Sequence, residues 1–219
     1  MNGAASRIAP FLFCFAVQQE AKPFLKRVRG RDDVRCLITG MGTKNAESAL
    51  RGALKDFLPQ SVLTCGFAGA LHPDLQIGDV VCSHEPWSPN AKKVQFTCTE
   101  RVATTVAEKA ILRNRTGADV VEMESAIITR VCHELGLPCR TVRVISDTAH
   151  EDLPLDFNAL MTEEKKLSAW KLAWAIARSP QRIPALMRLG KNSALASERL
   201  ADVLVAGLAL SAEQLQISA

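Results

Sequence analysis

The chain has 219 residues, which is enough for one domain with a sizeable core, or for one domain with a helical appendage. It carries 27 Lys and Arg against 23 Asp and Glu, and the net charge of +4 is too small and too spread along the chain to indicate nucleic-acid binding. The seven cysteines include no Cys-x-x-Cys pair, and the four histidines share no metal-ligand spacing. We therefore expect core thiols in a reducing cytoplasm, with no disulfide framework and no metal.

The N-terminal part predicts strands that alternate with helices. Ile8–Ala16 is apolar, but it is shorter than a membrane span and lacks the cleavage pattern of a signal peptide, so it predicts a first buried strand. Glu20 comes next, at the start of a helix, where a carboxylate usually compensates the helix dipole. Val34–Gly40 predicts a second strand, and Thr43–Phe57 predicts a helix.

Two glycine-containing turns follow predicted strands. Gly40-Met-Gly42 is a weak phosphate signal because the longer Gly-x-Gly-x-x-Gly pattern is absent, and a tight strand-to-helix turn explains it better. Ser61–Cys65 predicts a strand that runs into a loop of small residues, Gly66–Ala70. Such a loop lets the backbone approach a ligand closely, although a plain glycine turn is equally consistent with it.

The middle of the chain predicts two more strands, Ile77–Ser83 and Val94–Cys98. Thr105-x-x-Glu108 has the form of a capping box and predicts a helix that ends near Asn114. The stretch from Asp119 to Asp147 then predicts a strand, a helix up to Gly136 and a further strand.

Polar and acidic side chains end both strands of the 119–147 unit. Glu122 and Glu124 follow the first strand, and Ser146 and Asp147 end the second. Ligands of open α/β sheets bind at the carboxyl ends of the strands, so these side chains are expected to face one cleft. A helix N-terminal charge is enough to explain Glu122. It explains Asp147 poorly, because the residues after Asp147 predict a loop.

The last third of the chain predicts helices only, over residues 162–178, Gln181–Leu189 and Ser193–Leu210. Trp170 and Trp174 are four residues apart and share one helix face. Such a pair most often packs on the core of its own domain. The alternative is an apolar groove or an interfacial surface for a lipid tail, which nearby basic residues would support: Lys165, Lys166, Lys171, Arg178, Arg182 and Arg188.

Two motifs of the 119–147 unit carry a family resemblance. Val-Glu122-Met123-Glu124-Ser125-Ala and Arg143-Val-Ile-Ser146-Asp147 resemble the purine nucleosidase and nucleoside phosphorylase superfamily, including the methylthioadenosine/adenosylhomocysteine nucleosidases. The resemblance is closest to the hopanoid-associated members, which remove adenine from adenosylhopane, and it covers about residues 8–160. It implies an α/β domain over 1–160, with a twisted, mostly parallel sheet flanked by helices, and a C-terminal helical segment over 161–219.

The resemblance implies cleavage of the bond between adenine and ribose, without a cofactor. Asp147 would protonate or hydrogen-bond N7 of the base, and Ser146 would orient Asp147. Glu124 would hold the ribose hydroxyls, Met123 would pack beneath the sugar, and Glu20 would activate water.

Other residues receive roles from the same resemblance. Arg143 would pair with Glu20 or with the nucleophile, and Phe67 and Ala68 belong to the loop that lines the ribose and nucleophile site. Arg101 and Val102 would clamp the base by stacking and backbone hydrogen bonds, although an aromatic residue often takes the place of Arg101.

The chain departs from the family at two more places. Phosphorylases generally place an Arg and a Ser where this chain has Thr64 and Phe67, and a phenyl ring cannot bind a phosphate oxygen. Water is therefore favoured over phosphate, unless basic residues reach in from elsewhere. The segment from His84 to Thr97 is much shorter than in the better-known nucleosidases, which would open the site toward a bulky apolar 5′ substituent.

Two alternatives stay open. One is phosphorolysis that gives ribose 1-phosphate. The other is a non-catalytic nucleoside or lipid carrier, which would have no need of an acid and a base. The resemblance further implies a homo-oligomer that binds a small nucleoside substrate. The cysteines indicate the cytoplasm, the charge indicates no nucleic-acid partner, and the lipid alternative for the tryptophan pair would place the protein against the inner face of the membrane.

Overall fold

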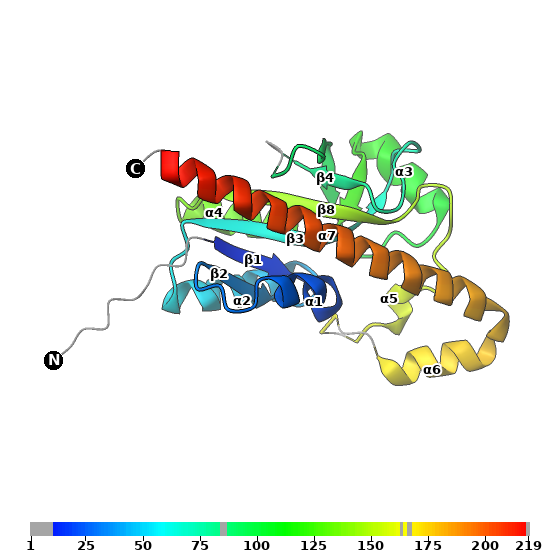
Figure 1. Ribbon diagram of the computed structural model, residues 1–219. Helices are drawn as coiled ribbons and strands as arrows, with labels where there is room; N and C mark the ends of the chain where they lie inside the picture. Colours follow the sequence, from blue (N-terminus) through cyan, green and yellow to red (C-terminus); the bar gives the residue numbers. More distant parts are fainter. Residues whose placement is uncertain (1–10, 84–86, 163, 166–167, 218–219) are drawn as a thin grey trace.

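The computed structural model describes residues 11–83, 87–162, 164–165 and 168–217, and it places one mixed sheet between layers of helices (Figure 1). The main path of the sheet has the order β2-β1-β3-β8-β4-β5, and β7 joins β3 to β6. Pairing is parallel except between β3 and β7 and between β4 and β8. The strands are β1 (Phe11–Phe15), β2 (Val34–Ile38), β3 (Ser61–Ala70), β4 (Val80–Cys82), β5 (Lys92–Lys93), β6 (Phe96–Cys98), β7 (Val120–Glu122) and β8 (Cys139–Asp147).

Helices cover both faces of the sheet. Alternate residues of β1 face opposite ways: Phe13 and Phe15 pack with α1 (Gln18–Arg27) and α7 (Ile183–Ile217), whereas Leu12 and Cys14 pack with α2 (Thr43–Asp56) and α4 (Ser125–Glu134). The predicted fold class, a mostly parallel sheet flanked by helices, is thus confirmed.

The two helices predicted at Gln181–Leu189 and Ser193–Leu210 form one long helix, α7. α7 runs unbroken through Gly190. A glycine inside a helix costs about 1 kcal/mol. Leu200 and Leu204 have no exposed surface in the core between α7 and the sheet, and burying each of them stabilises the helix by about 1.5–3 kcal/mol. Packing therefore outweighs the helix-breaking tendency of Gly190.

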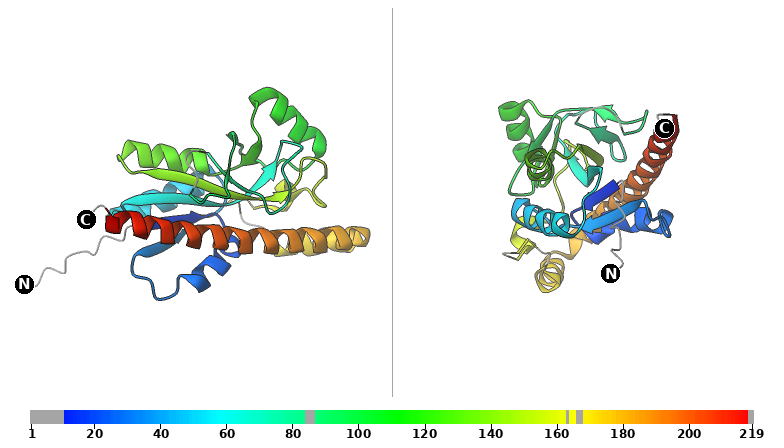
Figure 2. Two further views of the ribbon diagram at one scale, coloured as in Figure 1. Left: turned by 45° about the horizontal axis from the view of Figure 1, so that its top comes forward. Right: turned by 90° about the vertical axis from the view of Figure 1, so that its left-hand side faces the viewer.

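The first turns of α7 extend past the sheet. Figure 2 shows α7 lying along the sheet and continuing beyond its edge, where η1 (Pro180–Arg182) joins it to α6 (Ala169–Arg178). α5 (Phe157–Leu160) lies between β8 and α6 in the chain. Among the described residues, no helix combines the length and the apolar character needed to cross a membrane.

Two predicted local features have clear outcomes. The capping box is confirmed, because the backbone N–H of Glu108 donates to Thr105 Oγ1 (3.1 Å) and Glu108 accepts from the backbone N–H of Thr105 (3.2 Å) at the start of α3 (Val106–Thr116). The loop predicted at residues 66–70 is instead the end of β3, since it continues to pair with β8 and then with β7.

The short segment before β5 is anchored on α7. Trp87 is buried, and its indole N–H donates to the carbonyl oxygen of Leu204 at 3.1 Å. The ring lies against Gly207, where an added Cβ would be 2.0 Å from Trp87 Nε1. Only a glycine fits at that helix position. The prediction for this segment also included residues 84–86, which lie outside the described residues.

Candidate active site

A cavity of about 630 Å³ opens at the carboxyl ends of the central strands. Its wall includes the β1–α1 turn, the end of β3, the β7–α4 turn and the end of β8. Nearly all of the side chains predicted for the site line it: Glu20, Phe67, Ala68, Arg101, Val102, Met123, Glu124, Ser146 and Asp147. The two strand ends of the 119–147 unit do meet in one cleft, although β7 runs antiparallel to β3 and β8 runs parallel to it, because both strands pair with the end of β3.

Glu20 is fixed by three backbone donors. The N–H groups of Ala16 (3.0 Å) and Val17 (3.2 Å) donate to Oε2, and that of Phe67 (2.9 Å) donates to Oε1. A Cβ at position 66 would lie 2.6 Å from Oε1, so Gly66 is required for this close approach. Burial raises the pKa of Glu20, and the Phe67 N–H and Arg143 oppose that rise. Such a carboxylate is a stronger base than one in water.

Glu124 is held by the turn before α2. Its Oε1 accepts from the backbone N–H of Gly42 at 2.8 Å. Gly42 has a φ of 84°, a left-handed conformation that favours glycine. The Gly40-x-Gly42 turn thus positions a carboxylate. Burial and the neighbouring Glu122 raise the pKa of Glu124 to about 7, against the opposing effect of Arg143.

Arg143 lies behind the cavity wall, with an exposed fraction of 1%. Its Nη2 donates to Glu122 Oε2 at 2.7 Å and to Thr64 Oγ1 at 2.9 Å. This differs from the prediction that Arg143 binds substrate and pairs with Glu20 or the nucleophile. The reason is that Glu122 ends β7, which pairs with β3 as β8 does, and its buried carboxylate accepts from the guanidinium, so Arg143 supports the site from behind the cavity wall.

Glu122 has the structural role that its position at a helix start predicts. It accepts from the backbone N–H groups of Glu124 (3.0 Å) and Ser125 (2.9 Å) at the start of α4. Burial alone would raise its pKa, but Arg143, Cys98 and Ser125 outweigh burial, and the pKa of Glu122 is lowered. Next to burial, an ionised Glu122 close to Glu124 is the second cause that raises the pKa of Glu124.

Asp147 is held by two donors. Ser146 Oγ donates to Oδ1 at 2.8 Å, and Lys109 Nζ lies 2.7 Å from Oδ2. The strand register between β3 and β8 shifts at this point, after Ala68 and Ile145, and such a bulge re-aims the side chains beside it.

Lys109 was not singled out by the sequence analysis. It is fully buried on α3, and its ammonium also donates to the carbonyl oxygens of Thr148 (2.5 Å) and Glu151 (3.2 Å). One signal in the sequence could have indicated its burial: Lys109 lies three residues before Leu112, so both side chains are on the inward face of the capped helix. The Lys109 ammonium thus directs its three N–H donors at Asp147, Thr148 and Glu151, and this arrangement fixes the position of Asp147.

Asn158 occupies the backbone groups of Val102 that were predicted to clamp the base. The Val102 N–H donates to Asn158 Oδ1 and Asn158 Nδ2 donates to the Val102 carbonyl, both at 2.9 Å. A side-chain amide offers an acceptor beside a donor. The N1 and N6 edge of adenine offers the same pair, so base and amide compete for Val102. Arg101 lines the cavity as an exposed residue.

The cavity continues into an apolar end formed by the C-terminal helices. Leu172 of α6 and Leu186, Leu189 and Gly190 of α7 line it. A Cβ added at Gly190 would meet no atom within 4 Å. None of the described residues from 87 to 97 lines the cavity, so the wall at this end comes from α6 and α7.

Basic residues do reach the cavity. Lys22 lines it together with Arg101, whereas Thr64 is buried beneath the wall. Within the described part of the chain, no three His, Cys, Asp or Glu side chains gather as a metal site would need.

Comparison with known proteins agrees with this arrangement. The family model described as Phosphorylase superfamily matches residues 6–88 and 90–178, which is further than the residue 160 expected from the motifs. A 5′-methylthioadenosine/S-adenosylhomocysteine nucleosidase of Shewanella halifaxensis is 26% identical over a match 179 residues long; the match covers 63% of this chain and 78% of that protein.

Solved structures share the fold. A futalosine hydrolase mutant of Helicobacter pylori superposes with a TM-score of 0.67 at 17% identity, covering 90% of this chain and 97% of that chain. A 5′-methylthioadenosine/S-adenosylhomocysteine nucleosidase from Helicobacter pylori with butyl-thio-DADMe-Immucillin-A gives a TM-score of 0.65 at 16% identity, covering 92% and 98%. At this level of identity the likeness concerns the fold.

Proposed function

Since this chain belongs to the phosphorylase superfamily, we propose that it is a hydrolase that cleaves the N-glycosidic bond between adenine and a ribose with a large apolar 5′ group. The observation that carries the proposal is the convergence of three carboxylates, Glu20, Glu124 and Asp147, on one cavity. A carrier needs no such set. Their different environments suit them to different roles.

Asp147 acts on the base. Breaking the glycosidic bond builds negative charge on the departing purine, so a proton or a hydrogen bond at N7 lowers the barrier. Ser146 and Lys109 hold the carboxyl group at one angle through bonds to Oδ1 and Oδ2. Asp147 accepts from both partners as a carboxylate, so it has to take up a proton from water before it can give one to N7. A carboxyl group held in this way avoids reorganisation during the reaction.

Glu124 and Glu20 act on the sugar and on water. The Glu124 carboxylate accepts hydrogen bonds from the ribose hydroxyls, and Met123, which also lines the cavity, packs beneath the ring. Positive charge develops on the ribose as the base leaves. Glu20, with its raised pKa, takes a proton from the water that attacks this carbon.

The apolar end of the cavity receives the 5′ group. Leu172, Leu186 and Leu189 line this end, and each methylene buried there adds about 0.8 kcal/mol to binding. Adenosylhopane, in hopanoid biosynthesis, is the substrate that the resemblance names.

Gly190→Phe tests whether the 5′ group binds at this apolar end, because a Cβ at position 190 meets no atom within 4 Å and Gly190 lines the cavity. We expect loss of kcat/KM for long 5′-alkyl adenosines and little change for 5′-deoxyadenosine, with Gly190→Ala as the control.

The deciding experiment is product analysis of adenosine derivatives with and without phosphate. Hydrolysis gives free adenine and a 5′-substituted ribose at the same rate in both. A 5′-alkyl series should show kcat/KM rising with chain length. Absence of free adenine with every derivative would point to a carrier, and a flat series would leave a small-nucleoside hydrolase.

Phosphorolysis is the second candidate, favoured by one observation, the presence of Lys22 at the cavity. Phe67 also lines the cavity, and the Glu20 carboxylate would repel a phosphate, so water is the better nucleophile. Phosphate-dependent turnover with ribose 1-phosphate as product would establish phosphorolysis. Lys22→Ala should leave hydrolysis unchanged and should abolish any phosphate-dependent rate.

We also propose a homo-oligomer, as the resemblance implies, in the cytoplasm, as the cysteines indicate. Light scattering of the purified protein tests the first point, and fractionation of the source cells tests the second.

A further inference from the structure

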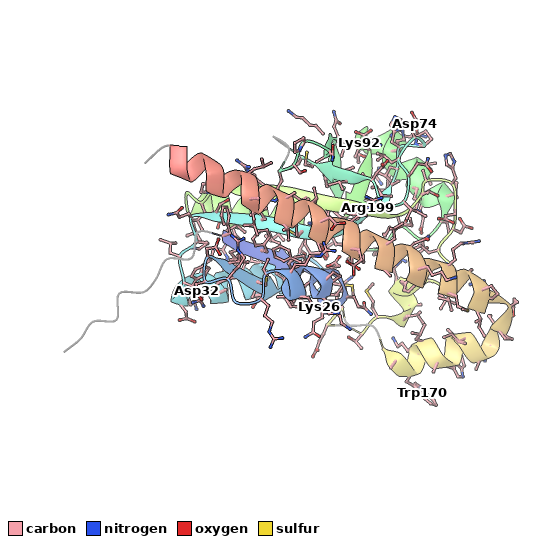
Figure 3. The ribbon with its side chains drawn as sticks, in the orientation of Figure 1. Lys26, Asp32, Asp74, Lys92, Trp170 and Arg199 are labelled. Atoms are coloured by element: carbon pink, nitrogen blue, oxygen red, sulfur yellow. The ribbon has the colours of Figure 1, made fainter. Side chains whose placement is uncertain are left out.

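The helix α6 has an apolar face that points away from the body of the protein. Trp170, Ala173, Trp174 and Ala177 follow the i, i+3, i+4, i+7 spacing of one helix face, and all four are exposed. The exposed fractions of the two tryptophans are 79% and 52%. In Figure 3 Trp170 projects from α6 on the side away from the sheet. The predicted tryptophan pair therefore does not pack on the core.

The opposite face of α6 is also apolar. Leu172, Ala175 and Ile176 are half-buried, and Leu172 lines the cavity. A helix that is apolar on both sides is normally covered on both sides. The adjoining first turns of α7 add the exposed Ile183 and Met187, one turn apart. We define the docking surface as Trp170, Ala173, Trp174, Ala177, Ile183 and Met187.

The stretch of sequence that contains this surface is rich in positive charge. Residues 165–197 contain seven of the 27 Lys and Arg residues and none of the 23 Asp and Glu residues, so the rest of the chain has 20 cations against 23 acids. The positive charge is therefore not spread evenly along the chain, as was expected from the net charge of +4, but is in excess over residues 165–197. The guanidinium of Arg178 lies over the indole ring of Trp174, 3.6 Å from the ring centroid, so a cation lies directly beside an exposed aromatic side chain.

The charge distinguishes between two partners. A symmetric contact between two copies would place this acid-free stretch against itself, and like charges would oppose it. An anionic lipid surface has the complementary charge, and tryptophan favours the boundary between lipid and water. We propose that α6 and the first turns of α7 bind an anionic lipid bilayer through this docking surface.

The position of α6 relates the docking surface to the cavity. One face of the helix carries Trp170 and Trp174, and the other carries Leu172 in the cavity wall. An apolar 5′ chain could then pass from the bilayer along α6 into the site with little exposure to water. This last step rests on the proposed function, whereas binding to the bilayer does not.

Flotation of the purified full-length protein with vesicles tests the proposal. We expect binding to vesicles of phosphatidylcholine with 30% phosphatidylglycerol, weak binding to pure phosphatidylcholine, and release as salt screens the charges. Trp170→Ser with Trp174→Ser should abolish flotation. Arg178→Gln with Arg188→Gln should lower the affinity about fivefold for each cation removed.

Matched controls come from surfaces elsewhere. Leu58→Ser removes an exposed apolar side chain, and Lys26→Gln with Lys93→Gln removes two exposed cations, and neither should change flotation. All of these variants should turn over 5′-deoxyadenosine as the wild type does, so a failure of the proposed function would be seen separately. Flotation retained in the tryptophan variant would overturn the proposal. So would equal binding to both vesicle types, or a dimer that dissociates in that variant.

Discussion

A pH dependence of ribose binding follows from the environment of Glu124. Its pKa is raised to about 7 by burial and by Glu122. Only the ionised form can accept hydrogen bonds on both oxygens from the ribose hydroxyls. Because the raised pKa favours the protonated form at low pH, affinity for a riboside should be highest above pH 8 and should fall as the pH drops through about 7.

The size of the effect follows from that pKa. A group with a pKa of about 7 is about nine-tenths ionised at pH 8 and about one-tenth ionised at pH 6. If substrate binds only the ionised form, the dissociation constant should rise about tenfold between these pH values. This change corresponds to about 1.4 kcal/mol.

Calorimetric titration in an Asp147→Asn background allows binding to be measured without turnover. This background is compatible with the local contacts, because the amide oxygen can accept from Lys109 while its nitrogen donates to Ser146 Oγ. The probes are 5′-deoxyadenosine and its 2′,3′-dideoxy analogue. The riboside should show the tenfold change and the analogue should show none.

Glu20 also has a raised pKa, so its titration has to be separated from that of Glu124. Adding Glu124→Gln should make riboside binding independent of pH and weak at every pH. If the riboside and the dideoxy analogue shared one pH profile, or if the profile survived Glu124→Gln, the assignment of Glu124 to the sugar would be refuted.

Three further predictions concern single residues. Asp147→Asn should keep the folded structure and lower kcat by about 10²- to 10⁴-fold; near-normal kcat with an adenine leaving group would remove Asp147 from the acid role. Lys109→Met should cost about 3–5 kcal/mol of stability in urea unfolding, because it leaves the Asp147 carboxylate near-buried without its cation, and adding Asp147→Asn should recover part of the loss; strictly additive effects would mean that the pair is not coupled. Gly207→Ala should destabilise by about 2 kcal/mol or more, since its Cβ would overlap Trp87, whereas Gly190→Ala, which meets open space, should stabilise by up to about 1 kcal/mol; equal changes in both variants would contradict the packing argument.

The parts of the molecule that local pattern determines were predictable. The strand–helix–strand unit from Asp119 to Asp147 has apolar runs of the right length, and the capping box at Thr105 is a local hydrogen-bond pattern. These features depend on few contacts between distant parts of the chain. Glu124 and Asp147 were expected to meet at the carboxyl ends of parallel strands, but β7 runs antiparallel to β3, and the two residues meet because β7 and β8 both pair with the end of β3.

The parts that distant contacts determine were not predictable. Arg143 pairs with Glu122 because β7 and β8 both pair with β3, and Lys109 reaches Asp147 from a helix that precedes it by a full strand–helix unit. The continuity of α7 through Gly190 depends on burial against the sheet. Spacing along the sequence contains no record of such contacts.

The amide of Asn158 changes what recognition of the base can achieve. Adenine at Val102 would replace two hydrogen bonds that already exist, so binding is an exchange that adds little net affinity. Its effect is on selectivity, because hypoxanthine carries an N1–H that would face the Val102 N–H, donor against donor. Asn158→Ala should therefore strengthen inhibition by adenine and leave hypoxanthine weak; equal gains for both bases would show that Val102 does not read the purine edge. The wild-type exchange also favours departure of the freed base, so that product inhibition stays low.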